Sequence, residues 1–134
     1  MTYSHIGVTD PFHLLSHHQN DPAKIEALVH IQRYHTSVFA GFLRTLAGLP
    51  DGDGSILDRS VILFGSNMSD SHRHDHYPLP LAVVVGGGGG ALGGGGHVSG
   101  PDRTPLSNLL VTLLHRAGVP VASLGDSTGE CAGI

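Results

Sequence analysis

Two short runs of apolar residues constrain the fold more than any other feature of the sequence. Residues 61–64 read Val-Ile-Leu-Phe, and residues 79–85 form a second apolar run with Pro80 near its start. A strand that is apolar on both faces is typical of a sheet covered by helices on both sides. Helical patterns precede and follow these runs. The order of elements therefore predicts an α/β fold with a small parallel or mixed sheet flanked by helices.

The flanking helices carry recognisable signals. Apolar residues recur with helical spacing over residues 23–46, directly after an Asp21-Pro22 pair that suits a helix start. A second helix is predicted from residue 104 or 105 to 116, and residues 119–124 are predicted to form a last short strand. Two or three strands leave a sheet with unpaired edges. We therefore expect the chain to form a homo-oligomer or to derive from a larger domain.

Composition excludes several classes of protein. The chain has 134 residues, of which 13% are charged, and its formal net charge is −4. This length suits a single α/β domain over residues 1–134, and the charge argues against a nucleic-acid partner. No apolar run is long enough to cross a membrane and no signal peptide is recognised, so a soluble protein is expected. Cys131 is the only cysteine, which excludes an intrachain disulfide and a thiolate metal cluster.

Histidine is the unusual component, with 11 residues. The first group lies in residues 1–21, a segment predicted to be irregular and to bear metal ligands. His13 and His17 are four residues apart and His18 follows directly. Two imidazoles at that spacing share one face of a helical turn and can bind one metal ion. The segment is predicted to bind metal through His13 and His17, with His18 on a second metal or orienting a partner; the alternative is a solvated polar loop.

The second group follows the first predicted strand. Its residues with oxygen, nitrogen or guanidinium groups are Asp70, His72, Arg73, His74, Asp75 and His76. In an extended segment the three histidines would lie on one side. We expect them to bind metal, Asp70 or Asp75 to act as general base or to orient a metal ligand, and Arg73 to bind an anionic group. The alternative is a histidine-rich loop without metal.

A glycine-rich run over residues 86–97 lacks the Gly-Lys-Ser/Thr ending of a phosphate-binding loop. It is predicted to deliver His97 to the metal site. Asp51 and Asp53 in the turn before the first strand suit either a calcium loop or a plain turn. His35 lies on the apolar helix face, where a hydrogen-bonded core histidine is the simplest interpretation.

Several of these motifs resemble one family in order along the chain. They are residues 13–18 (HLLSHH), 51–58 (DGDGSILD), 65–69 (GSNMS), 73–76 (RHDH), the glycine-rich run ending in His97, and 124–129 (LGDSTG). Together they resemble the C-terminal part of the uncharacterised bacterial HXXSHH family, whose members are longer and to which no activity is assigned. That resemblance leaves open whether members are exported.

A more distant similarity is to the alkaline phosphatase and sulfatase superfamily. It implies a fold like the C-terminal half of an alkaline phosphatase. His13 and His17 then match an Asp-x-x-x-His metal pair, Ser66 and Asn67 match an Asp-His pair, and His97 matches a late histidine ligand. The nucleophile of that superfamily comes from an N-terminal half that is not in this sequence.

Two functions from different classes follow. One is a metal-dependent enzyme: a hydrolase acting on a small anionic ester with zinc first among the metals, or an oxidative enzyme with copper or iron. The other is a non-catalytic metal-binding or self-assembling module whose histidines link subunits. A metal-free assembly that responds to pH through clustered histidines is a third hypothesis.

Overall fold

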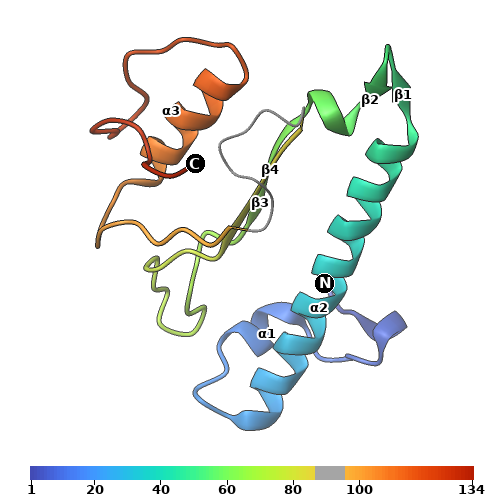
Figure 1. The fold of residues 1–134 in the computed structure, drawn as a ribbon. Coiled ribbons are helices and arrows are strands. Elements are labelled where there is room, and N and C mark those ends of the chain that lie inside the picture. The colour runs from blue at the N-terminus through green and yellow to red at the C-terminus, as the bar shows by residue number, and fades with distance from the viewer. Residues whose placement is uncertain (87–95) are drawn as a thin grey trace. The chain divides into compact units, whose positions relative to one another are not determined.

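The computed structural model describes residues 1–86 and 96–134 (Figure 1). The chain divides into two compact units. The first comprises Met1–Leu46 and Phe64–Leu81, and the second comprises Ala47–Leu63 and Ala82–Ile134. Helices and two small sheets are present, which confirms a fold of mixed α and β elements. Most of the glycine-rich run, residues 87–95, lies outside the described residues.

The N-terminal segment of the first unit is folded, whereas the sequence predicted it to be irregular. It contains a 3-10 helix, η1 (Ser4–Ile6), and a short helix, α1 (Phe12–Ser16). Tyr3 and Val8 exchange backbone hydrogen bonds of 3.1 and 3.2 Å across the turn that contains η1. Backbone pairing and apolar burial together order this segment.

The long helix α2 (Pro22–Gly48) confirms the helix predicted over residues 23–46. Asp21 Oδ1 accepts a hydrogen bond of 2.9 Å from the backbone N–H of Ala23, so Asp21 caps the first turn as its sequence position predicted. Pro22 fits the first helical position because no intrahelical bond is required of its nitrogen.

The core of the first unit is built where α2 meets the N-terminal segment. Its buried side chains are Tyr3, Val8, Leu15 and Ile31. His35 of α2 joins this core through a bond of 2.8 Å between its Nε2 and the hydroxyl oxygen of Tyr3. The interpretation of His35 as a hydrogen-bonded core histidine is confirmed.

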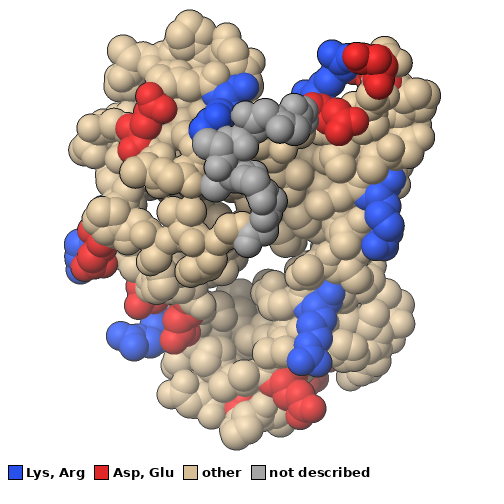
Figure 2. Space-filling model, viewed as in Figure 1, with Lys and Arg blue, Asp and Glu red and all other residues tan. Residues whose placement is uncertain are grey.

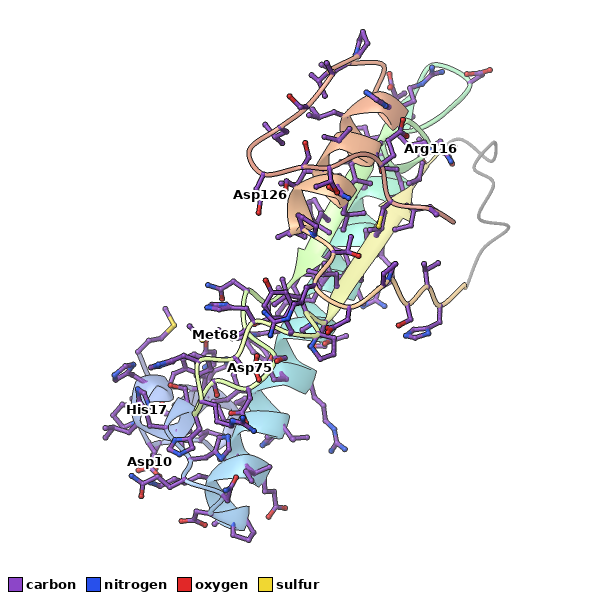
Figure 3. The ribbon with its side chains drawn as sticks, turned by 90° about the vertical axis from the view of Figure 1, so that its left-hand side faces the viewer. Asp10, His17, Met68, Asp75, Arg116 and Asp126 are labelled. Atoms are coloured by element: carbon purple, nitrogen blue, oxygen red, sulfur yellow. The ribbon has the colours of Figure 1, made fainter. Side chains whose placement is uncertain are left out.

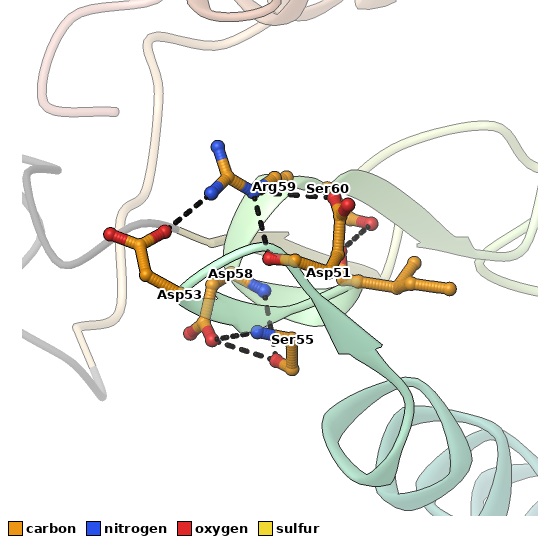
Figure 4. A network of polar contacts seen from close by, with 7 residues as sticks. Asp51, Asp53, Ser55, Asp58, Arg59 and Ser60 are labelled. Carbon is orange, nitrogen blue, oxygen red and sulfur yellow. Dashed lines mark hydrogen bonds and ion pairs between the residues drawn. The ribbon is translucent and has the colours of Figure 1, made fainter.

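The second unit begins with a tight hairpin. β1 (Pro50–Asp51) and β2 (Gly54–Ser55) pair antiparallel, and a 3-10 turn, η2 (Leu57–Arg59), follows. Arg59 closes the hairpin, with Nη2 at 2.6 Å from Asp53 Oδ1 and Nε at 3.2 Å from Asp51 Oδ2 (Figure 4). The Arg59 guanidinium forms ion pairs with the two carboxylates that a calcium ion would need as ligands. This pairing favours the plain turn over the calcium loop.

The two apolar runs form the second sheet, from β3 (Val61–Gly65) and β4 (Leu81–Val85). Ser66 N–H donates to the Pro80 carbonyl at 3.2 Å, and Gly86 N–H donates to the Ser60 carbonyl at 2.8 Å. These pairings run in opposite directions along the two segments, so the sheet is antiparallel. The prediction of a parallel or mixed sheet is wrong for the described strands, because the connection between them contains no crossover helix.

The helix α3 (Leu106–Arg116) confirms the second predicted helix. Its buried polar side chains bond to the segment that follows. Thr128 N–H donates to Asn108 Oδ1 at 2.8 Å, and Cys131 N–H donates to Thr112 Oγ1 at 2.8 Å. Among the described residues, 119–124 form no strand, contrary to the prediction. Side-chain bonds to α3 hold the C-terminal segment instead.

Charged side chains are sparse and interspersed on the face drawn in Figure 2, where acidic and basic groups lie scattered among other residues. Within residues 1–86 and 96–134, no helix combines the length and apolar character that crossing a membrane requires.

Candidate metal site

Helix α1 brings His13 and His17 together. Its first turn forms on the Pro11 carbonyl, which accepts from Leu14 and Leu15 N–H at 2.9 and 3.2 Å. The imidazoles of His13 and His17 lie 4.8 Å apart between ring centroids, at 83° to each other. The predicted pairing of these two histidines is therefore observed, on one short helix and the residue that caps its C-terminus.

The loop between β3 and β4 carries the second histidine group, but it is a tight turn and not an extended segment. Asp75 N–H donates to the Asp70 carbonyl at 3.0 Å, and Ser69 N–H donates to the Asp75 carbonyl at 2.8 Å. His74 has a φ of 55°, in the left-handed region. The prediction that His72, His74 and His76 lie on one side of an extended strand is wrong, because the turn reverses the chain within the group.

The loop and the end of α1 lie side by side in the first unit; Figure 3 labels His17 on one segment and Asp75 on the other. Ser71 Oγ donates to the Ser16 carbonyl at 2.9 Å. The ring centroid of His17 lies 5.2 Å from that of His74 and 6.4 Å from that of His72. The turn therefore brings two of its three histidines to the pair on α1.

His17 is the centre of this cluster, which also determines its charge state. Partial burial lowers the pKa of His17, and the neighbouring imidazoles of His13, His74 and His72 lower it further. A neutral imidazole has a free lone pair, which is the form that binds a metal ion. His17 is therefore in the neutral form that can bind a metal ion near neutral pH.

Two of the predicted ligands have a ring nitrogen in use. Asn20 N–H donates to His18 Nδ1 at 3.1 Å, so the proton of a neutral His18 must be on Nε2, which faces Asp70 Oδ1 at 3.6 Å. His76 Nδ1 lies 2.7 Å from the carbonyl oxygen of Asn67, which can only accept, so this nitrogen carries the proton. His76 is exposed and has no ring contact with the cluster in the described residues.

His72 differs from both. Its Nδ1 is buried and has no hydrogen-bond partner in the described residues. The centroid of its ring lies 5.3 Å from that of His18 and 6.4 Å from that of His17. A buried polar nitrogen without a partner costs free energy, typically about 1–3 kcal/mol. A metal ion bound to this nitrogen would remove that cost.

The donor atoms do not converge in this arrangement. Within the described residues, no group of three or more His, Cys, Asp or Glu side chains is placed to hold a metal ion. Four imidazole rings with no hydrogen bond in the described residues lie close together, those of His13, His17, His72 and His74. Their side-chain bonds would have to rotate before the four rings could bind one cation.

The acidic candidates build the turn. Asp70 Oδ1 accepts from His72 N–H at 2.9 Å and from Arg73 N–H at 3.2 Å. Asp75 Oδ1 accepts from Tyr77 N–H at 3.1 Å. The hydrogen bonds to Arg73 N–H and His72 N–H lower the pKa of Asp70, as do the nearby His18 and Arg73 side chains, against partial burial, which raises it. The catalytic roles of Asp70, Asp75 and Arg73 stay predictions.

His97 is exposed and belongs to the second unit. Its place among the metal ligands, and delivery by the glycine-rich run, stay predictions. Sequence reasoning missed Asn20 and Ser71, which orient the two segments. Their roles depend on contacts between distant parts of the chain, and neither residue belongs to a motif that could have revealed it.

No protein-family model, no curated protein and no solved structure matches this chain. The resemblance to the HXXSHH family, and the more distant one to the alkaline phosphatase superfamily, therefore stay predictions.

Proposed function

We propose that this chain is a metal-binding module whose ligands are His13, His17, His72 and His74. The observation that carries the proposal is the arrangement of three imidazoles around His17, one of which has a buried nitrogen without a partner. The buried Nδ1 of His72 without a partner is unfavourable, whereas a cation bound to it would compensate for the missing hydrogen bond.

The spacing of the rings supports this proposal. Zinc binds imidazole nitrogen at about 2.0–2.1 Å, which places the centroids of two rings on one tetrahedral ion about 5 Å apart. The centroid of His17 lies 4.8 Å from that of His13 and 5.2 Å from that of His74. The His72 ring, at 6.4 Å from His17, would have to approach the other rings.

The donor set favours a particular class of metal. Imidazole nitrogen suits zinc, copper and iron, whereas magnesium and calcium require oxygen ligands. The nearest carboxylates, those of Asp70 and Asp75, already accept backbone hydrogen bonds within the turn. Zinc is therefore the first metal to test and copper the second.

The test is metal content after complete removal by a chelator and reconstitution with zinc. We expect the wild-type chain to retain zinc through gel filtration, and both His13→Gln and His17→Gln to lose most of it. His30→Gln is the matched control, because His30 is exposed on α2. Equal zinc content in His17→Gln and the wild type would contradict the proposal.

A second candidate function is hydrolysis of a small anionic ester. It is favoured by the longer separation of His72 from His17, since binding by His13, His17 and His74 alone leaves a fourth position for water. A zinc-bound water ionises near pH 7. In this candidate Arg73 holds the anion and Asp70 or Asp75 takes the proton, in a fold like the C-terminal half of an alkaline phosphatase.

The hydrolase is tested on the zinc-loaded chain with aryl phosphate and sulfate esters. Turnover that is lost in both His13→Gln and Arg73→Gln would support it, while no turnover of any ester would remove it. The same reconstitution with copper or iron tests the oxidative alternative, for which oxygen consumption is the measurement.

Homo-oligomerisation belongs to the same proposal. The outer edges of β3 and β4 have no partner strand in the described residues, and His76 presents an exposed Nε2 without a proton. A second copy can pair with such an edge and share such a histidine. Light scattering after gel filtration, with zinc and with chelator, tests this; a monomer under both conditions would contradict it.

A further inference from the structure

We propose that His18 is not a metal ligand and that His18 and Asp70 together join the two segments that carry the ligands. This inference rests on the proposed metal site and assigns its supporting residues. One segment is the end of α1 with His13 and His17; the other is the turn with His72 and His74.

Asp70 organises the turn. Its Oδ1 accepts from the backbone N–H groups of both His72 and Arg73, and its backbone pairs with Asp75 in an isolated antiparallel bridge. These bonds fix the backbone that carries His72 and, two residues further on, His74. The turn therefore positions its histidines through Asp70.

His18 organises the other segment. The hydrogen bond from Asn20 N–H to Nδ1 is unambiguous, because a backbone N–H can only donate. A neutral His18 thus carries its proton on Nε2. Binding a metal through Nε2 would require that proton to move to Nδ1, which would break the hydrogen bond from Asn20 N–H. Metal-bound histidines ordinarily donate a hydrogen bond from their second nitrogen, and His18 has the opposite arrangement.

The two supports face each other. His18 Nε2 lies 3.6 Å from Asp70 Oδ1, and the His18 side chain is only 12% exposed. The hydrogen bond from Ser71 Oγ to the Ser16 carbonyl is a second polar contact between the two segments. The Nε2–H of His18 and the carboxylate of Asp70 therefore face each other across the two segments at the edge of the cluster, slightly beyond hydrogen-bond distance. A metal ion that draws the two segments together would shorten this separation into a hydrogen bond.

Removing this link should weaken metal binding without removing a ligand. Loss of a group that orients metal ligands typically reduces metal affinity by about 10–100-fold. We expect that range for His18→Gln and for Asp70→Asn, measured as the zinc dissociation constant in competition with a chromophoric chelator. Asp70→Asn keeps an oxygen that accepts from His72 and Arg73 N–H, so the turn should remain folded, and it removes the negative charge that faces His18 Nε2–H.

Controls separate this role from general destabilisation. Asp75→Asn changes a carboxylate of the same turn for which no contact to His18 is found in the described residues, and His30→Gln removes an exposed histidine of α2. Both should bind zinc within about 3-fold of the wild type. The melting temperature of metal-free Asp70→Asn should equal that of the metal-free wild type. A fall in that temperature together with lower affinity would contradict a positioning role.

A double-mutant cycle tests the pairing directly. If His18 and Asp70 act through each other, His18→Gln/Asp70→Asn should bind zinc no more weakly than the weaker single variant. Losses that multiply would overturn the link. X-ray absorption should show the same number of histidine ligands in the zinc-loaded wild type and in zinc-loaded His18→Gln. One histidine ligand fewer in the variant would show that His18 binds the metal and would overturn the inference.

The outcomes also distinguish this inference from the proposed function. A wild-type chain that binds no zinc removes both. If the wild-type chain binds zinc and His17→Gln does not, while His18→Gln and Asp70→Asn bind zinc with full affinity, the proposed metal site stands and only this inference is overturned.

Discussion

Helix α1 should depend on one side chain for its position. Leu15 is 2% exposed and packs in the core with Ile31, whereas its neighbour Leu14 is 60% exposed. A helix of five residues is too short to be stable by itself, so tertiary packing must hold it. Leu15 is the buried residue of α1 and therefore its anchor.

Replacing Leu15 with alanine removes most of that anchor. Leu-to-Ala changes at buried sites cost about 2–5 kcal/mol, the upper end applying where the cavity does not collapse. Leu15 is one of the four buried residues of a small core, against which partly buried hydrophobic side chains also pack. We expect a loss of about 3 kcal/mol in the free energy of unfolding of the first unit. Leu14→Ala, in the same helix, should change it by less than about 0.5 kcal/mol.

Urea denaturation followed by circular dichroism measures both variants in the presence of a chelator. The same variants with zinc report on the site, since His13 and His17 flank Leu15 in α1. Leu15→Ala should also bind zinc more weakly than Leu14→Ala. Equal denaturation midpoints for the two variants would refute the claim that Leu15 anchors α1.

Three further predictions concern other parts of the chain. An alanine Cβ at Gly86 would clash with the Leu57 carbonyl oxygen, so Gly86→Ala should lower the melting temperature strongly. Gly41→Ala, in α2 with nothing within 4 Å of the new Cβ, should raise the free energy of unfolding by about 0.5–1 kcal/mol, and the reverse order of the two variants would contradict the packing. The hydrogen bond to the Val121 carbonyl and the nearby Glu130 raise the pKa of His115, against partial burial, which lowers it. Protonated His115 therefore stabilises the folded state in full below pH 6.5, and this contribution is lost as pH rises through the folded-state pKa. Denaturation midpoints across that range should fall with pH in the wild type and less in His115→Gln; parallel curves would exclude the effect. Zinc at 100 times its dissociation constant should stabilise the first unit by about 2.7 kcal/mol, and thermal unfolding that is insensitive to zinc would count against folding-linked binding.

Local signals in the sequence predicted the elements that depend on local interactions. The boundaries of α2 follow from helical periodicity and from the Asp21 cap, which acts within one turn. The positions of β3 and β4 follow from their apolar runs. Their antiparallel pairing did not follow, because apolar character on both faces suggested burial between helices, and the direction of pairing depends on the connection.

The candidate site was predictable by residue type and not by geometry. His13 and His17 meet because α1 gives them helical spacing, which the sequence shows. His72 and His74 reach them only because Asp70 folds its segment into a turn and His74 adopts a positive φ. The sequence therefore grouped His76 with the other two, although its ring has no contact with the cluster in the described residues.

The most direct test of the account is zinc stoichiometry by equilibrium dialysis and elemental analysis, on the wild-type chain and on His17→Gln. His17 contacts the rings of His13, His72 and His74, so its loss removes the centre of the cluster. The account predicts one tightly bound zinc ion per wild-type chain, a number that follows from a single cluster around His17, and close to none in the variant. A wild-type chain that binds no zinc, or a variant that binds as much as the wild type, would contradict it.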